Sequence, residues 1–370
     1  HFFLSQFFRE KYDSTLETMP YLNTQVNINR IEVWVTNKIN QTQNVRNILA
    51  LQDLAESDPS KTKIDDFYPS FIINVGSNVY PDNSVNKFDP KSIGSDLLNS
   101  SIRQISDVKK GFGVISNLVS EGNDYSVLEN ARKLEPNEYR LHEKLGYITL
   151  NQSLNNDEIL AVAFQYTVGG QVYQVGEFAN DGVDATNINQ QEISNNSLIL
   201  KMLKSSLINI NQPVWDLMMK NIYSVGSYRI SKSDFKFNIF YSNPSPINYI
   251  DPVDPLIWPE NIKGRTLLSL FNFDNLNMNN DIQNGGDGFF DFVPNLTIDS
   301  NNGLIIFSSV EPFGKFLFDK LKNANSSSEL YDSYDTYNVN QKKYVYQEIY
   351  KLSKTGAEEK IEKNKFQLKG

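Results

Sequence analysis

Two adjacent glycines between apolar, β-rich runs constrain the fold of this chain more than any other feature. Residues 159–168 alternate their apolar side chains between two faces, as a strand requires. The pair Gly169-Gly170 follows, and residues 171–178 return as a second β-rich run. Both residues of a two-residue hairpin turn can need positive φ, which glycine adopts at little steric cost. The sequence therefore predicts an antiparallel hairpin over 159–178.

Further short strands with turn-rich joints recur along the second half of the chain. The run 235–241 alternates with period two, and other predicted strands cover 139–150, 197–203, 266–272, 296–299, 303–309 and 365–369. Amphipathic helices are expected near 213–225, 312–323 and 343–354. Together these patterns predict an α+β fold, mainly an antiparallel β-sandwich-like layer with inserted helices.

The chain is expected to divide into three parts. Residues 1–56 predict a small N-terminal α/β block, with a strand over 28–36 and a helix over 44–55, where Val45, Ile48 and Leu49 have helical spacing. Residues 57–134 predict a long loop or insertion, mobile or draped over the surface to about residue 97, with short helices at 96–108 and 125–134. Residues 135–370 form the β-rich domain. The Asn-rich tracts 186–196 and 275–284 are expected to be loops.

Composition excludes several classes of function. The 370 residues are 39% hydrophobic and 21% charged, which is typical of a folded chain. A net charge of −9 argues against a nucleic-acid partner, which would need clustered Lys and Arg. The charged stretch 351–369 is expected to be a solvated helix face. No apolar run reaches the ~18 residues that a membrane-spanning helix needs.

Catalytic signals are absent from the sequence. There is no cysteine and there are only two histidines, which leaves no thiolate chemistry and almost no basis for a histidine general base. A Gly-rich phosphate loop and a Gly-x-Ser-x-Gly elbow are both missing. The chain is therefore expected not to be an enzyme, and no catalytic or cofactor-binding residue is predicted.

One acidic tract has the spacing of a metal-binding loop. Oxygen ligands at alternate positions, with glycine allowing a sharp turn, are typical of calcium loops. The candidate ligands are Asp274, Asn277, Asp281, Asp287 and Asp291. The alternative is an Asx-rich turn whose side chains bond their own backbone. A calcium ion here would be structural, and no other cofactor is expected.

The tryptophans leave a rival function open. Trp34, Trp215 and Trp258 could stack on sugar rings, as in a carbohydrate-binding β-sandwich module of a secreted surface protein. Trp215 lies on the apolar stripe of a predicted helix, which favours burial. Packing in the core is the alternative for Trp34 and Trp258, and exposed aromatic side chains on one sheet face would instead favour the sugar-binding module.

Several short segments of the sequence, taken in the order in which they occur, resemble segments of a known protein family. The most specific is Arg30-Ile-Glu-Val-Trp-Val-Thr-Asn37, and Ala161-Val-Ala-Phe-Gln-Tyr-Thr167 and Trp215-Asp-Leu-Met-Met-Lys-Asn-Ile-Tyr223 follow it. These segments resemble the SprA (Sov) family, the giant outer-membrane translocon of the type 9 secretion and gliding-motility machinery. The resemblance covers nearly the whole chain except residues 57–95 and 181–196, where insertions are expected.

The resemblance implies a protein-secretion channel that passes folded cargo proteins to the cell surface. This chain would be a soluble piece of such a channel that does not itself span the membrane, and it would cap the pore or contact partners and cargo. Its implied partners are other secretion-system outer-membrane proteins and secreted cargo proteins. The implied location is the outer membrane or cell surface, with the side left open. The family is a transporter, so no catalytic residues carry over.

Overall fold

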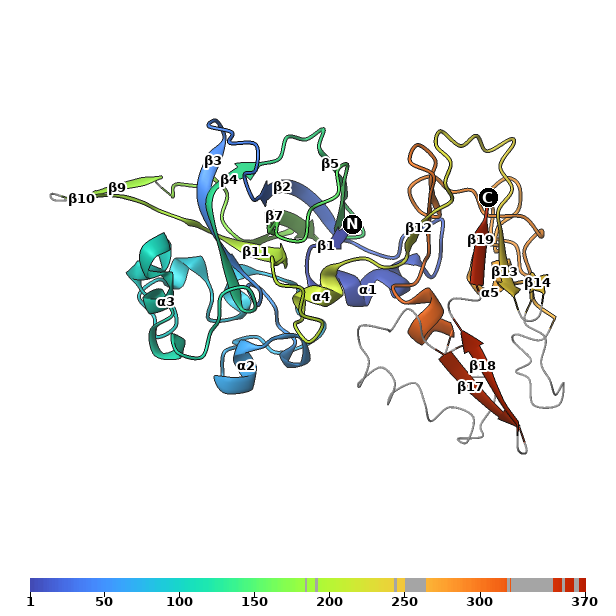
Figure 1. The fold of residues 1–370 in the computed structure, drawn as a ribbon, viewed down its shortest axis with the longest axis horizontal. Coiled ribbons are helices and arrows are strands. Elements are labelled where there is room, and N and C mark those ends of the chain that lie inside the picture. The colour runs from blue at the N-terminus through green and yellow to red at the C-terminus, as the bar shows by residue number, and fades with distance from the viewer. Residues whose placement is uncertain are drawn as a thin grey trace. The chain divides into compact units, whose positions relative to one another are not determined.

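The computed structural model of the chain describes residues 1–183, 185–189, 192–242, 245–249, 264–317, 320, 349–354, 357–362 and 366–370. The chain divides into two compact units (Figure 1). Unit 1 comprises residues 1–11 and 24–219, and unit 2 comprises residues 12–23 and 220–370. The predicted division at 56/57 and 134/135 differs from this one, because strands from all three predicted parts pair within unit 1.

Unit 1 is built on a six-stranded sheet that closes on itself. Its strands are β2 (Asn27–Val35), β3 (Val45–Leu51), β4 (Tyr125–Lys133), β7 (Leu160–Val168), β8 (Gln171–Val175) and β11 (Leu198–Lys204). The order is β11-β3-β4-β2-β7-β8, and β11 also pairs with β7, so β11, β3, β4, β2 and β7 form a closed ring. The β11–β3 pair is parallel and the others are antiparallel.

The predicted hairpin is confirmed. Strands β7 and β8 pair up to Val168 opposite Gln171, and the two turn glycines have φ of 56° and 86°. Along the strands of the ring, residues 48–51 and 160–164 are fully buried. Because neither face of these segments meets water, they read as continuous apolar runs rather than as alternating ones.

A second, three-stranded sheet in unit 1 has the order β1-β6-β5. Its strands are β1 (Phe2–Phe3), β5 (Tyr139–His142) and β6 (Tyr147–Leu150). Helix α1 (Gln6–Leu16) follows β1, and its first turns place the Phe8 ring 5.8 Å from the ring of Tyr166 on β7. Residues 12–16 of the same helix belong to unit 2.

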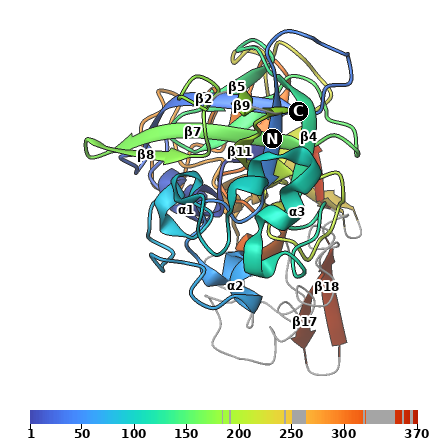
Figure 2. The same cartoon turned by 90° about the vertical axis from the view of Figure 1, so that its left-hand side faces the viewer.

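The segment between β3 and β4 is packed rather than loosely draped. Phe71, Phe88, Leu97 and Leu98 are almost completely buried, so this segment supplies part of the core of unit 1. Figures 1 and 2 show α2 and α3 on one side of the closed sheet. Asp or Asn side chains accept an N–H at the start of η1, η2, η3 and η4, which explains the repeated Asp and Asn in this stretch. Its helices are η1 (Pro59–Lys61), α2 (Ile64–Phe67), η2 (Asn83–Val85), η3 (Pro90–Ser92), η4 (Ser100–Arg103), η5 (Ile105–Asp107), α3 (Val108–Gly111) and η6 (Gly113–Ile115).

Unit 2 has small sheets around an aromatic core. One sheet has the order β12-β16-β15 and another β14-β13-β19, while β17 pairs with β18. Phe271, Phe273, Phe307 and Phe313 lie at the centre of its core. Its elements are β12 (Ile222–Ser224), β13 (Asn238–Ser242), β14 (Pro246–Ile247), helix α5 (Leu267–Leu270), β15 (Ile298–Asp299), β16 (Leu304–Ile306), the π-helix η7 (Pro312–Phe316), β17 (Ile349–Lys354), β18 (Ala357–Glu362) and β19 (Phe366–Lys369). The α+β class with mostly antiparallel strands is confirmed.

Two predicted N-terminal helices are wrong. Residues 45–51 form β3 and residues 125–133 form β4, and these strands pair with each other in the ring. The spacing of Val45, Ile48 and Leu49 fits a helix, but Ile48 and Leu49 are followed by two more fully buried residues, which requires burial on both faces. Such a short apolar run cannot be assigned by periodicity alone.

Four later predictions also differ from the structure. The predicted helix at 213–225 is a single turn, α4 (Val214–Leu217), because the chain then becomes extended and Met218 bridges to Phe2. The predicted strand 266–272 contains α5, capped by the Thr266 side chain, which accepts the Ser269 N–H. Residues 349–354, predicted to be helical, form β17, and this also removes the expected helix face within 351–369. Residues 343–348 lie outside the described part.

Candidate functional site

A two-stranded ribbon projects from the closed sheet of unit 1 (Figure 1). It consists of β9 (Thr186–Asn189) and β10 (Glu192–Asn195), which pair antiparallel with Ile188 opposite Ile193. The predicted loop over 186–196 is therefore wrong. In the part of the chain that the structure describes, neither strand pairs with a third one. Both outer edges of the ribbon thus present unpaired backbone groups, and Glu192 is the only charged residue of the two strands.

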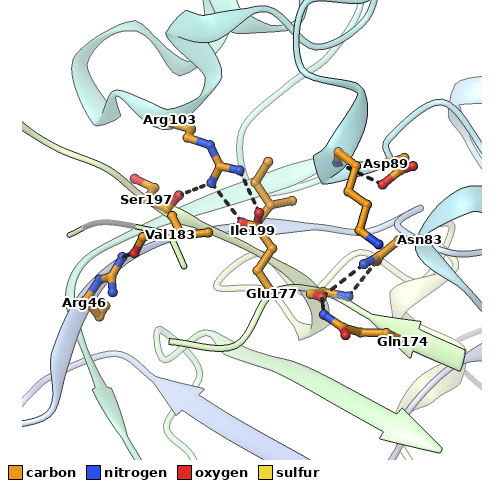
Figure 3. A network of polar contacts seen from close by, with 11 residues as sticks. Arg46, Asn83, Asp89, Arg103, Gln174, Glu177, Val183, Ser197 and Ile199 are labelled. Carbon is orange, nitrogen blue, oxygen red and sulfur yellow. Dashed lines mark hydrogen bonds and ion pairs between the residues drawn. The ribbon is translucent and has the colours of Figure 1, made fainter. Parts of the chain in front are cut away.

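An Arg–Glu ion pair joins the two legs of the ribbon at its base (Figure 3). We define the first leg as residues 176–183 and the second leg as residues 195–199. The guanidinium of Arg103 donates to both carboxylate oxygens of Glu177 at 2.7 and 2.9 Å, with the side chains only 16% and 12% exposed. Arg103 Nη1 also donates to the Ser197 carbonyl at 3.0 Å. Because Glu177 precedes β9 and Ser197 follows β10, one arginine connects both legs.

Glu177 strengthens the same connection through the backbone. Its Oε2 accepts the N–H of Ile199 at 2.9 Å, and its own N–H donates to the Ile199 carbonyl at 3.0 Å. At the start of the second leg, directly after β10, Gln104 Nε2 donates to Asn196 Oδ1 at 3.2 Å. A bidentate, largely buried ion pair with further hydrogen bonds has a defined geometry, unlike an isolated surface pair. The second leg is thereby held to the segment around η4.

The first leg is held by side chains from β3 and from the segment between β3 and β4 (Figure 3). Arg46 on β3 donates to the carbonyls of Ala179 and Val183 at 3.4 and 3.1 Å. The buried Asn83 side chain exchanges two hydrogen bonds with the backbone of Gly176, at 2.8 and 3.1 Å. These contacts fix where the ribbon leaves the sheet. The side chains at the base therefore position the ribbon, and the groups available for binding are the backbone edges of β9 and β10.

Sequence reasoning did not single out the residues of this base. Arg103 and Glu177 are 74 positions apart, and no local pattern connects them. The Asn-rich composition of the ribbon indicates a loop. Only the spacing of Thr186 and Ile188 fits a period of two, because Ile193 lies five positions after Ile188, so the sequence signal for the two strands is weak.

The predicted calcium ligands lie in unit 2, in a loop whose carboxylates bond its own backbone. Asp274, which is buried, accepts the N–H groups of Asp287 and Gly288 at 2.8 and 3.0 Å through Oδ1. Asp291 accepts two backbone N–H groups from residues 275 and 276 at 2.8 and 3.2 Å. Burial, together with the charges of Asp274 and Asp287, raises the pKa of Asp291 to about 6.

The remaining two candidates form a turn of their own. Asn277 Oδ1 accepts the N–H groups of Asn279 and Asp281 at 2.9 and 3.0 Å. This is the pattern of an Asx turn. Within the described ranges, no group of three or more His, Cys, Asp or Glu side chains is arranged to hold a metal ion. Calcium binding by the five residues stays a prediction.

The tryptophans occupy different environments. Trp34 is buried in the closed sheet, and its indole N–H donates to Glu32 at 3.3 Å. Trp215 is half-buried on α4. Trp258 lies outside the described residues. Trp34 therefore cannot serve as a stacking platform for a sugar.

None of the helices in the described part of the chain has the length and apolar character needed to cross a membrane. No curated protein matches the chain. Residues 5–159 match the family model SprA_N, described as motility related/secretion protein. The match covers strands β2, β3 and β4 of the closed sheet, and it ends before β7, β8, β11 and the ribbon. It agrees with the resemblance seen in the sequence and supports membership of the SprA family of motility- and secretion-related proteins.

Proposed function

We propose that this chain is a protein-binding region of an outer-membrane secretion channel, and that it contacts partners through the β9–β10 ribbon. Its partners would be other outer-membrane proteins of the type 9 secretion and gliding-motility system, or cargo proteins in passage. In that setting it caps the pore or holds what passes through it. The chain would be located at the outer membrane or cell surface. The family match supports the secretion part of this proposal.

The open edges of the ribbon carry the binding part of the proposal. A strand with unpaired N–H and C=O groups is a template for pairing with another chain. Partners that add a strand to such an edge gain main-chain hydrogen bonds without a deep pocket. An isolated two-stranded ribbon is marginally stable in water. Anchoring by Arg103 and Glu177 therefore reduces the entropy lost when a partner strand docks.

We also propose that the chain works by surface binding rather than catalysis, with no cofactor and no nucleic-acid partner. Its negative charge repels a phosphate backbone. The acidic loop at 274–291 uses its carboxylates to hold backbone N–H groups. The rival carbohydrate-binding function has no comparable support, because Trp34 is enclosed in the sheet.

The test is a pull-down with the tagged 370-residue chain as bait. Outer membranes of a bacterium with a type 9 secretion system are solubilised in detergent, and the captured proteins are identified by mass spectrometry. Three baits are compared: the unchanged chain, a chain in which residues 186–195 are replaced by Gly-Ser-Gly, and Ile39→Ser. Ile39 is 69% exposed in a different loop of unit 1, so Ile39→Ser controls for loss of an exposed apolar group.

The unchanged chain and Ile39→Ser should enrich secretion-system proteins or cargo, and the ribbonless chain should lose about nine tenths of that enrichment, the effect of a roughly tenfold loss of affinity at low occupancy. Hydrogen exchange in β3 and β11 checks that the ribbonless chain keeps its fold. Capture of polysaccharide alone would overturn the proposed function. Equal capture with and without the ribbon would leave the function standing and reject the ribbon as its contact.

A further inference from the structure

The two legs of the ribbon differ in length between the hydrogen bonds that join them. At the sheet, the Glu177 N–H donates to the Ile199 carbonyl at 3.0 Å, and beside the ribbon the Asn196 N–H donates to the Ala185 carbonyl at 2.9 Å. The first leg takes residues 178–184 to span this interval, several more than the second leg. Extra residues on one strand of a pair bend that strand. The direction in which the ribbon leaves the sheet therefore depends on what holds the extra residues.

Arg30 on β2 holds the extra residues at two points. Its Nη1 donates to both carboxylate oxygens of Asp181 at 2.9 and 3.2 Å. The guanidinium carbon also lies 3.7 Å from the centre of the fully buried Phe178 ring, which is a close cation–π contact. One planar guanidinium thus binds an apolar and an acidic side chain of the first leg.

Glu32 holds the same leg through its backbone. It lies two residues after Arg30 on β2, so both side chains point to the same face of the strand. Its Oε2 accepts the Ala179 N–H at 3.1 Å and the Trp34 indole N–H at 3.3 Å, while Oε1 accepts from Lys133 at 2.7 Å. Because the indole and the ammonium orient this buried carboxylate, it offers Ala179 an acceptor in a fixed place.

The Arg30–Asp181 pair should matter more for the position of the leg than for the stability of unit 1. The two side chains are 37% and 36% exposed, and ion pairs of such exposure contribute little to folding. Removing the pair leaves the hydrogen-bonded ladders of β2 in place. The extra residues of the first leg would then be released, and the ribbon could pivot about the Arg103–Glu177 pair at its base.

We propose that Arg30 and Glu32 are positioning residues that set the direction of the β9–β10 ribbon by clamping its first leg to β2. A clamped ribbon presents its edges in one orientation, so a partner strand does not have to order them first. This consequence for binding rests on the proposed role of the ribbon. The effect of the clamp on the ribbon's direction does not.

The test first measures the direction of the ribbon in the full 370-residue chain without a partner. The chain has no cysteine, so spin labels can be placed on two introduced ones. Asn189→Cys labels the end of β9, and Val172→Cys labels an exposed position on β8 in the sheet. Double electron–electron resonance then gives the distribution of distances between the two labels.

The variants separate the clamp from a general loss of charge. Arg30→Asp breaks the ion pair, and Arg30→Asp with Asp181→Arg rebuilds it with the charges exchanged. Lys38→Asp is the matched control, because Lys38 forms an exposed ion pair with Asp157, and both residues lie outside the two legs. Glu32→Leu removes the acceptor of the Ala179 N–H, whereas Glu32→Gln keeps an acceptor there.

Arg30→Asp should raise the share of distances outside the main peak about fivefold, the effect of losing one exposed ion pair and one cation–π contact. The exchanged pair should reverse at least part of this rise, and the melting temperature should fall by no more than about 4 °C. Glu32→Leu should broaden the distribution and Glu32→Gln should broaden it less. Equal distributions for Arg30→Asp and Lys38→Asp, or a broadening that the exchanged pair does not reduce, would overturn the proposal.

The same variants then serve as baits in the pull-down described above. Weaker capture by Arg30→Asp, with recovery in the exchanged pair, would support the consequence for binding. Equal capture despite a broadened distance distribution would reject the ribbon as the contact and leave the clamp standing. A failure of the clamp and a failure of the proposed function are therefore seen in different measurements.

Discussion

Replacing Lys201 by methionine should strongly destabilise unit 1, because this lysine is buried in the closed sheet with one carboxylate partner. Lys201 on β11 is 1% exposed and Glu56 is 3% exposed, and their Nζ and Oε1 atoms lie 2.7 Å apart. Nζ also donates to the Gln52 carbonyl, and Glu56 Oε1 accepts the N–H of Gln6 at 3.1 Å. Methionine keeps the length of the side chain but removes its charge and its donors.

Two contributions set the magnitude. Removing one partner of a buried ion pair leaves an uncompensated charge and typically costs about 3–5 kcal/mol. A second carboxyl lies close by, since the charge of Lys201 lowers the pKa of Asp53 and that of Glu56 raises it. Without Lys201 the two buried carboxyls repel, so the folded chain takes up a proton near neutral pH. We therefore expect the loss to be larger at pH 7 than at pH 5, and the melting temperature of unit 1 to fall by roughly 10 °C.

Urea unfolding followed by hydrogen exchange in β3 and β11 measures this loss for unit 1 alone, which matters because a chain with two units need not unfold in one step. Replacing both partners, with Lys201→Met and Glu56→Leu, should return the stability to within about 1 kcal/mol of the unchanged chain, because no buried charge of the pair remains. If Lys201→Met alone costs less than ~1 kcal/mol, the pair is not desolvated as described and the reasoning fails.

Three smaller predictions concern other buried or strained positions. Burial raises the pKa of Asp53 from 3.8 to about 6, so this carboxyl lowers stability as the pH rises from about 4 to about 6; Asp53→Asn should remove up to about 3 kcal/mol of that fall in a pH series of urea unfolding. Gly286→Ala should destabilise unit 2 by more than Gly285→Ala, although both have positive φ, because its Cβ would meet the Asp274 carbonyl oxygen at 2.4 Å whereas position 285 is open; thermal melts of the two variants compare them directly. Because Asp274 and Asp291 already accept four backbone N–H groups, 1 mM calcium should leave the melting temperature within about 1 °C of that in EDTA, and a rise of several degrees would instead support the calcium loop.

Local sequence patterns predict the parts of the fold in which a strand is buried on one face only or in which a turn needs particular residues. The Gly169-Gly170 hairpin follows from two adjacent residues that tolerate positive φ, and strand β2 follows from its alternation. Strand β3 could not be assigned in this way. Its residues 48–51 are fully buried, and its ladder partners β4 and β11 lie far away in the sequence. An apolar stripe at helical spacing was accidental there.

The candidate site was less accessible from the sequence than the fold. The bidentate contact between Arg103 and Glu177 depends on the closing of the sheet, which brings the segment after β8 beside the start of β11. The acidic loop 274–291 shows a different limit, because its local pattern is visible in the sequence but has two structural interpretations. Its Asp and Asn spacing is compatible with both a calcium loop and an Asx-rich turn, because spacing alone does not tell whether carboxylate oxygens face an ion or the loop's own N–H groups.

The treatment of strand edges in unit 1 explains why the ribbon is the best candidate for a contact. Closing the ring removes the edges of β2, β3, β4, β7 and β11 over their paired stretches. The outer edge of β8 is covered by side chains, since Asp82 accepts the Gln174 N–H at 3.0 Å and Asn83 accepts that of Gly176 at 2.8 Å. Natural proteins cover or charge their edges because open ones recruit other chains. The β9–β10 ribbon has neither protection. It is nearly uncharged and anchored at its base, and within the described residues its strands pair only with each other. Open edges of this kind are expected if another protein completes the pairing.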